Sequence, residues 1–258
     1  MMLENMQIFY LGSNNILGIE YIKAILSLKS KVIPYTIKRN GPDYNSLDEI
    51  DELASATAIR EKLKKDKDVS KLMPKNAYEI LNEQNKYGKA ILDLNAYEKE
   101  ILYKFRLMSV DEIKNLQDVS EGLENKIKDA ANSCNELETF ISKIKSKRYP
   151  RARIQRICLY GLLNITKKDV LDSYKVTPYV RVLGFNQNGK MLLSRTINKN
   201  KKFPVITSVK KFMDNSNNKI YKNMLEKDIL ATNVYTLGYG YDSKANLDYT
   251  QKLIINNE

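Results

Sequence analysis

The middle of the chain carries the feature that most constrains its fold, a long run of helical periodicity. From residue 69 to about residue 174, apolar residues recur at three- and four-residue steps in one short segment after another, and that spacing places them on one face of an α-helix. Pro74 stands where a helix can begin, and Ser109 and Ser120 stand where capping boxes are expected. The pattern predicts six or seven short helices.

An α/β segment is expected before these helices. Apolar residues at helical spacing predict a helix over residues 14–30, and a β-rich run predicts a strand over residues 31–38. Pro34 interrupts that run, which makes it an edge strand or a bulged one. A further helix is expected to begin at Ser55 or Thr57, because either hydroxyl can cap its N-terminus.

The pattern changes again after Pro178. Residues 179–186 and 203–209 are rich in β-branched residues and predict strands, the run Asn-Gln-Asn-Gly-Lys at 186–190 predicts a turn, and residues 218–237 predict a helix. We therefore expect an α+β, mainly helical fold. Its expected parts are an α/β segment over residues 1–66, a helical domain over 67–176 and a small α/β tail over 177–258.

Histidine is absent from all 258 residues. That absence excludes histidine–serine and histidine–cysteine catalysis and any metal site built on histidine. The two cysteines, Cys134 and Cys158, show the spacing of neither a zinc site nor a disulfide framework. No apolar run approaches the roughly 20 residues of a membrane span, and the N-terminus is a poor signal peptide. We expect a cytoplasmic protein with no protein-bound metal.

The charge of the chain favours a polyanionic partner. Its net charge is +12, from 43 Lys and Arg against 31 Asp and Glu. Lysine enrichment for solubility, or the codon bias of an AT-rich genome, is the open alternative. The charge also clusters, because the 30 residues between Glu138 and Asp169 contain no acid and nine bases: Lys143, Lys145, Lys147, Arg148, Arg151, Arg153, Arg156, Lys167 and Lys168.

The helix expected after Pro150 is amphipathic. Its core-facing side would be Ile154, Ile157, Cys158, Gly161, Leu162 and Ile165. Arginine suits phosphate oxygens through its planar fork, and tyrosine can stack on an unpaired base. A solvated basic face is the alternative, and a membrane-surface helix is disfavoured because the apolar side lacks Trp and Phe. We predict RNA binding by Lys147, Arg148, Arg151, Arg153, Arg156 and Tyr160.

The segment from Ser55 to Arg60 reads Ser-Ala-Thr-Ala-Ile-Arg. A helix N-terminus rich in Ser and Thr offers backbone N–H groups and hydroxyls to a phosphate, and Arg60 adds a positive charge one turn later. Alone, the motif is weak and is more typical of an ordinary capped helix.

Five segments occur in one order along the chain. They are Asn-Asn-Ile-Leu-Gly from Asn14, Pro-Tyr-Thr-Ile-Lys-Arg ending at Arg39, the Ser55 motif, SEGLENKI from Ser120 and KSKRYPRARIQRICLYGLL from Lys145. As a set, from about residue 11 to about residue 184, they resemble the bacterial tRNA(Met) cytidine acetate ligase family, within the nucleotidyltransferase superfamily.

The resemblance implies an ATP-dependent ligase. It would activate acetate as acetyl-adenylate and acetylate the wobble cytidine of elongator tRNA(Met) to N4-acetylcytidine. ATP is implied as a substrate, with Mg as a candidate companion ion, and residues 1–66 as a remnant of the nucleotide-binding domain. The implied tRNA site is the basic helical region, and no catalytic residue can be assigned. The implied ATP contacts are Asn14, Arg39, Ser55, Thr57 and Arg60.

One departure from the family is large. Its members carry a Pro-Phe-His-x-Gly-His turn that holds the triphosphate, and a chain without histidine does not contain that turn. Adenylylation needs preorganised positive charge around the phosphates. We therefore expect a truncated product or one half of a split protein, inactive without a separately encoded N-terminal half. The alternative is a non-catalytic RNA-binding module.

Overall fold

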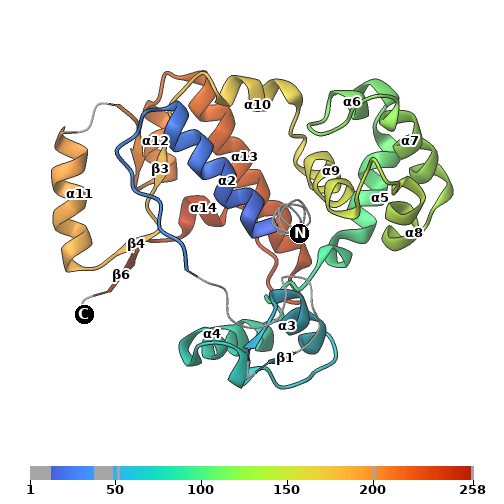
Figure 1. Ribbon diagram of the computed structural model, residues 1–258, viewed down its shortest axis with the longest axis horizontal. Helices are drawn as coiled ribbons and strands as arrows, with labels where there is room; N and C mark the ends of the chain where they lie inside the picture. The colour runs from blue at the N-terminus through green and yellow to red at the C-terminus, as the bar shows by residue number, and fades with distance from the viewer. Residues whose placement is uncertain (1–12, 38–48, 51–52, 200–201, 257–258) are drawn as a thin grey trace, which may run out of the picture. The chain divides into compact units, whose positions relative to one another are not determined.

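The computed structural model describes residues 13–37, 49–50, 53–199 and 202–256 (Figure 1). The chain divides into two compact units, Met1–Ile59 and Arg60–Glu258. Most of the described residues lie in helices, so the mainly helical α+β class is confirmed. The strands are short, each of them two residues long.

In the first unit, the predicted N-terminal helix is confirmed as α2 (Ser13–Ser27). The strands β1 (Glu49–Ile50) and β2 (Leu53–Ala54) pair antiparallel, with Glu49 opposite Ala54. The helix α3 (Ala56–Leu63) follows and runs across the boundary between the two units.

The prediction of a strand at residues 31–38 is wrong for residues 31–37, which form no regular structure. Residue 38 lies outside the described residues. A strand requires a hydrogen-bonded neighbour, and no described strand pairs with this segment. Pro34 also lacks the N–H that such a ladder would need. The apolar side chains of residues 31–37 are exposed to solvent, with Ile33 88% and Tyr35 89% exposed.

The apolar side of α2 and the segment after it together line a groove of about 550 Å³. Leu26 and Leu28 of this region are 71% and 77% exposed, so much apolar surface lies open among the described residues of the unit. Such surfaces favour association or local opening.

Seven helices occupy the region in which six or seven were predicted. They are α4 (Lys75–Lys86), α5 (Glu98–Leu107), α6 (Val110–Asn115), α7 (Leu123–Ser133), α8 (Leu137–Ile144), α9 (Arg151–Leu163) and α10 (Lys167–Ser173). The 3₁₀ turns η1 (Ser70–Leu72) and η2 (Leu94–Tyr97) precede α4 and α5. The predicted number and type of elements are therefore confirmed.

Of the two predicted capping boxes, the one at Ser109 is confirmed. Its hydroxyl accepts from the Glu112 N–H at 3.2 Å, and the Glu112 carboxylate accepts from the Ser109 N–H at 2.7 Å. The box at Ser120 is wrong. Gly122, with φ of 80°, leads the chain into α7, so Ser120 lies too far from the first turn to cap it.

The main core lies between α5, α7, α8 and α9 (Figure 1). Phe105 of α5 and Phe140 of α8 are fully buried, with their ring centroids 5.7 Å apart. Gly161 of α9 lies against the Phe105 ring, where a Cβ atom would fall 2.5 Å from Cζ. The glycine therefore lets α9 approach α5 more closely than a residue with a Cβ atom at this position would allow.

The C-terminal region mixes helices with two small parallel ladders. Its elements are β3 (Val180–Arg181), β4 (Gly184–Phe185), α11 (Gln187–Lys199), β5 (Val205–Ile206), α12 (Val209–Asn215), α13 (Lys219–Tyr235), η3 (Thr236–Gly238), α14 (Leu247–Thr250) and β6 (Ile254–Ile255). β3 pairs with β5, and β4 with β6. Strands thus form within both predicted runs, and the predicted helix at 218–237 is confirmed as α13.

The turn predicted at residues 186–190 is wrong, because α11 begins at Gln187. The Asn186 side chain accepts a hydrogen bond from the Gly189 N–H at 3.0 Å, which is the geometry of a helix N-cap. Asparagine favours turns and helix starts for the same reason, its short side-chain acceptor, so the local sequence was ambiguous.

The C-terminal region packs against the helical region, since α13 contacts both α9 and α10 (Figure 1). A second small core forms around Ile206, Val209, Leu225 and Ile229. Contacts divide the chain only between Ile59 and Arg60. The three-part division at residues 66 and 176 stays a prediction.

Replacing Gly161 with alanine should destabilise the second unit by about 1–3 kcal/mol, because the new methyl group would overlap the Phe105 ring. Chemical denaturation monitored by circular dichroism measures this. The double variant Gly161→Ala/Phe105→Leu should lose less stability than the sum of its single changes, since a smaller side chain leaves room for the methyl group. Additive losses would show that this contact does not limit the packing of α9.

Candidate nucleotide and RNA interface

Three of the five predicted ATP contacts lie at the start of α3. Ser55 is buried, and its hydroxyl accepts a hydrogen bond from the Ala58 N–H at 3.0 Å. Of the two predicted caps, Ser55 is therefore the residue that caps α3. Thr57, half-buried, and Arg60, exposed, follow within the first turns of the helix. The helix N-terminus carries partial positive charge, which Arg60 reinforces.

The other two predicted ATP contacts cannot be placed with these three. Asn14 lies in the first turn of α2, but its side chain is outside the described residues, and Arg39 lies outside them altogether. The ATP contacts at Asn14 and Arg39 stay predictions.

The basic helix α9 has the predicted two-sided character. Ile154, Ile157 and Cys158 are buried with Gly161, whereas Arg151 and Arg156 are exposed and Arg153 and Tyr160 are half-buried. Lys147 and Arg148 are exposed in the loop that leads into the helix. The six predicted RNA-binding residues thus lie along one helix and the loop before it.

Carboxylates from other segments pair with the exposed arginines of this face. Arg151 donates two hydrogen bonds to Glu138 of α8, at 2.5 and 2.6 Å. These bonds lower the pKa of the Glu138 carboxyl. Arg156 pairs with Asp118 at 2.9 Å, and Arg148 pairs with Glu121.

Residues 139–168 contain no acid in the sequence, but in the folded protein carboxylates from other segments lie beside their arginines. Glu138 borders that run, while Asp118 and Glu121 precede it by about 20 residues, so no window along the chain could have found these pairs. The arginine side chains remain largely in solvent, with Arg151 44% and Arg156 53% exposed. Exposed ion pairs contribute typically less than about 1 kcal/mol, so a polyanion can displace the carboxylates.

Arg153 has a different environment from its neighbours. Its guanidinium donates to the Asp118 carbonyl at 2.6 and 3.1 Å and to the Ser120 hydroxyl at 3.0 Å. It also lies 5.1 Å from the centroid of the buried Tyr149 ring. Arg153 therefore holds the loop that presents Asp118 to Arg156, a supporting role that sequence reasoning missed.

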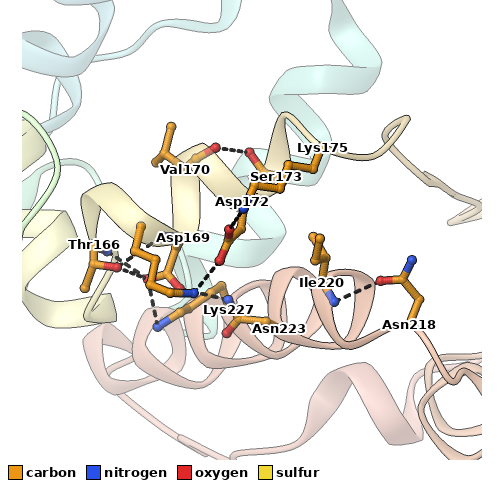
Figure 2. A network of polar contacts seen from close by, with 11 residues as sticks. Thr166, Asp169, Val170, Asp172, Ser173, Lys175, Asn218, Ile220, Asn223 and Lys227 are labelled. Carbon is orange, nitrogen blue, oxygen red and sulfur yellow. Dashed lines mark hydrogen bonds and ion pairs between the residues drawn. The ribbon is translucent and has the colours of Figure 1, made fainter.

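A polar network joins the C-terminal end of α9 to α10 and α13, and Figure 2 shows the part of it between α10 and α13. Asn164 ends the helix in a left-handed conformation, with φ of 50°. Lys227 of α13 donates to the Asn164 carbonyl at 2.6 Å and lies 3.8 Å from the Asp169 carboxylate. An ammonium group at this position stabilises the negative end of the helix dipole.

Asp169 is the centre of this network (Figure 2). Its carboxylate accepts from the Thr166 N–H at 2.9 Å and from the Asn223 amide at 2.8 Å. Burial by itself would raise the pKa of the Asp169 carboxyl, but these hydrogen bonds outweigh it and lower that pKa. The network ties α9 and α10 to α13, so the position of the basic helix depends on the C-terminal region.

Within the described part of the chain, no three His, Cys, Asp or Glu side chains gather in a way that could hold a metal ion. None of the helices that the structure describes is long and apolar enough to cross a membrane.

Comparison with known proteins identifies clear relatives. The family model for HIGH Nucleotidyl Transferase matches residues 2–250. A tRNA(Met) cytidine acetate ligase from Caldanaerobacter subterraneus is 39% identical over 244 residues, which are 94% of this chain and 59% of the relative. The protein of that name from Acetivibrio thermocellus is 37% identical over 254 residues, which are 95% of this chain and 61% of the relative.

Solved structures agree with the sequence comparison. The apo crystal structure of Thermotoga maritima TmcAL superimposes with a TM-score of 0.89 at 27% identity, over 99% of this chain and 63% of that one. TmcAL bound with alpha-thio ATP gives 0.85 at 26% identity, over 99% and 62%. The resemblance and the nucleotidyltransferase-like fold predicted from the sequence are confirmed. The chain spans about three fifths of the length of these relatives.

Replacing Asp169 with asparagine should make the stability of the second unit less dependent on pH. A lowered pKa in the folded state means that Asp169 stabilises the fold above its unfolded pKa of about 3.9 and loses that contribution as the pH falls further. Melting temperatures between pH 7 and pH 3 measure the difference. The exposed Asp214→Asn on α12 is the control, and equal acid sensitivity of both variants would contradict the role of Asp169.

Proposed function

The chain belongs to the HIGH Nucleotidyl Transferase family, and from that membership we propose that it acts as part of an ATP-dependent ligase that acetylates tRNA(Met) in the cytoplasm. The observation that supports this most is the match of nearly the whole chain to proteins named tRNA(Met) cytidine acetate ligase. The likeness to TmcAL bound with alpha-thio ATP supports ATP as the nucleotide.

The proposed reaction has two steps. An acetate oxygen attacks the α-phosphorus of ATP, which releases pyrophosphate and gives acetyl-adenylate. The N4 amine of the wobble cytidine then attacks the acetyl carbon, loses a proton and releases AMP, which leaves N4-acetylcytidine in elongator tRNA(Met).

In this proposal the start of α3 contributes to binding the nucleotide. Thr57 and Arg60 would contact phosphate oxygens, while Ser55, which accepts from the Ala58 N–H, fixes where the helix begins. Asn14 and Arg39 are proposed as further ATP contacts. Mg would enter with ATP, and no proposed step depends on a metal held by this chain.

The α9 face is the proposed tRNA site. Lys147 and Tyr160 would contact the RNA directly, and Arg148, Arg151 and Arg156 would do so after exchanging a carboxylate for a phosphate. Arg153 would contribute through the loop that it supports. The release of counterions from the RNA provides the driving force for this exchange.

Glu138→Gln should strengthen binding of unmodified tRNA(Met) by about threefold or more. The change leaves Arg151 without its carboxylate partner, so one more cation is available, and the slope of log K against log salt should steepen by about 1. Filter binding across a salt series measures both quantities.

Glu79→Gln is the matched control, because Glu79 also faces a basic residue, Lys75 at 3.8 Å, but lies on α4. It should change the affinity by less than about twofold. If the two variants behave alike, Arg151 is not part of the tRNA site.

Catalysis requires more than these residues. The chain contains no histidine, so the histidine turn that the resemblance predicts for the triphosphate site is not within it. This absence favours the second candidate function, a non-catalytic tRNA-binding module, for the 258 residues on their own.

An acetylation assay separates the two functions. With acetate, ATP and unmodified tRNA(Met), the 258-residue chain alone should give no N4-acetylcytidine by mass spectrometry. Adding the N-terminal part of a related ligase should restore it if the ligase proposal is right. Product from the chain alone would refute the expected inactivity, and no product in the supplemented reaction would favour the binding module.

A further inference from the structure

Tyrosines gather around one lysine where the end of α4 meets the residues that follow η3. We define the tyrosine platform as Tyr87, Lys89, Tyr235, Tyr239 and Tyr241. It belongs to the second unit and lies outside the α9 face and the start of α3.

Two glycines bring its two segments together. The Gly240 N–H donates to the Gly88 carbonyl at 2.8 Å. Gly88 has φ of 62°, and a Cβ atom there would fall 3.1 Å from the Gly240 Cα. Only glycine fits both the conformation and the close approach.

A buried tyrosine supports the platform from beneath. The Tyr97 hydroxyl donates to the Tyr235 carbonyl at 2.9 Å, and Gly238 packs directly against the Tyr97 ring. Burial raises the pKa of Tyr97 to about 12, so this hydroxyl keeps the proton that it donates. The platform is therefore held in place before any ligand arrives.

Two rings of the platform lie beside the lysine. The Lys89 ammonium lies 5.7 Å from the centroid of the Tyr239 ring and 6.0 Å from that of Tyr87. Tyr235 meets Tyr239 edge to face, with centroids 5.7 Å apart. Tyr87 is 56% and Tyr241 72% exposed, so these two rings are available to a partner.

Flat, exposed rings around a cation are suited to unpaired bases. A base stacks on tyrosine whatever its identity, and an adjacent lysine contacts the phosphate. Within the two segments that form the platform, residues 86–89 and 239–244, the three bases Lys86, Lys89 and Lys244 outnumber the one acid, Asp242, which Lys244 binds at 2.7 Å. Such a surface attracts a polyanion and repels a basic peptide.

We propose that the tyrosine platform binds unpaired nucleotides of an RNA, with bases stacked on Tyr87 and Tyr241 and a phosphate on Lys89. This inference rests on the proposed function to the extent that RNA is taken as the substrate. It adds a single-strand site to the arginine face of α9.

Fluorescence anisotropy with a labelled twelve-nucleotide oligouridylate tests the site in the 258-residue chain. Tyr87→Ala and Tyr241→Ala should each weaken binding about fivefold or more, because each removes a stacking surface. Tyr241→Phe should bind like the unchanged protein, since it keeps the ring. Tyr103→Ala is the matched control, because Tyr103 is a 66% exposed tyrosine on α5.

The salt dependence provides a second readout. Lys89→Gln should reduce the slope of log K against log salt by about 0.7, the value for one phosphate contact on a single strand. The tyrosine variants should leave that slope unchanged. Circular dichroism confirms that each variant is folded.

The outcomes separate this site from the proposed function. If both tyrosine variants bind oligouridylate within twofold of the Tyr103→Ala control, or if the unchanged protein does not bind it, the platform inference is overturned, whatever the acetylation assay gives. If the variants lose binding while the supplemented reaction makes no acetylcytidine, the platform stands and the ligase proposal fails.

Discussion

The close packing of α9 against α5 is the constraint on which the rest of the second unit depends. Gly161 lies against the Phe105 ring, and Ile154, Ile157 and Cys158 fill the same interface. Because these contacts fix how α9 is rotated about its axis, they also fix which side chains face outward. Lys227 then binds the carbonyl at the end of the helix, so its position along the axis is set from α13. The basic face is therefore positioned by apolar packing and a helix cap, not by its own charges.

Those charges are moderated by the protein itself. Arg151 and Arg156 meet Glu138 and Asp118, and such exposed pairs are individually weak and screened by salt. At the proposed tRNA site their effect would be competitive: a partner would have to present several phosphates together to replace several carboxylates. A single free anion gains little from displacing one of them, whereas an RNA strand gains from each contact and from the released counterions. At the proposed tRNA site, the same acids would therefore disfavour small anions and favour a polyanion.

Sequence reasoning succeeded where the information is local. The seven helices follow from apolar spacing, and the Ser109 box and the Ser55 cap follow from residues three positions apart. It failed where the outcome depends on a distant partner or on an ambiguous residue. Residues 31–37 have the composition of a strand but no described neighbour to pair with, and Asn186 begins a helix where a turn was predicted. Three features join segments that lie far apart in the chain, so no local sequence pattern predicts them. They are the carboxylates opposite the arginines, the support that Arg153 gives to Asp118, and the tyrosine platform.

Recognition of the RNA and chemistry on the nucleotide place different demands on these residues. The proposed formation of acetyl-adenylate would need several positive groups converging on the triphosphate, and Arg60 and the N-terminus of α3 are the described candidates for that role. Binding of RNA needs spaced cations and stacking surfaces, and Arg60–Glu258 holds both on a packed scaffold with its own core. In the proposed function, recognition and chemistry therefore rest on different residues: the proposed RNA surfaces lie within Arg60–Glu258, whereas the proposed nucleotide site at the start of α3 begins at Ser55. A change that removes one of these sets of contacts would leave the packing of the other in place.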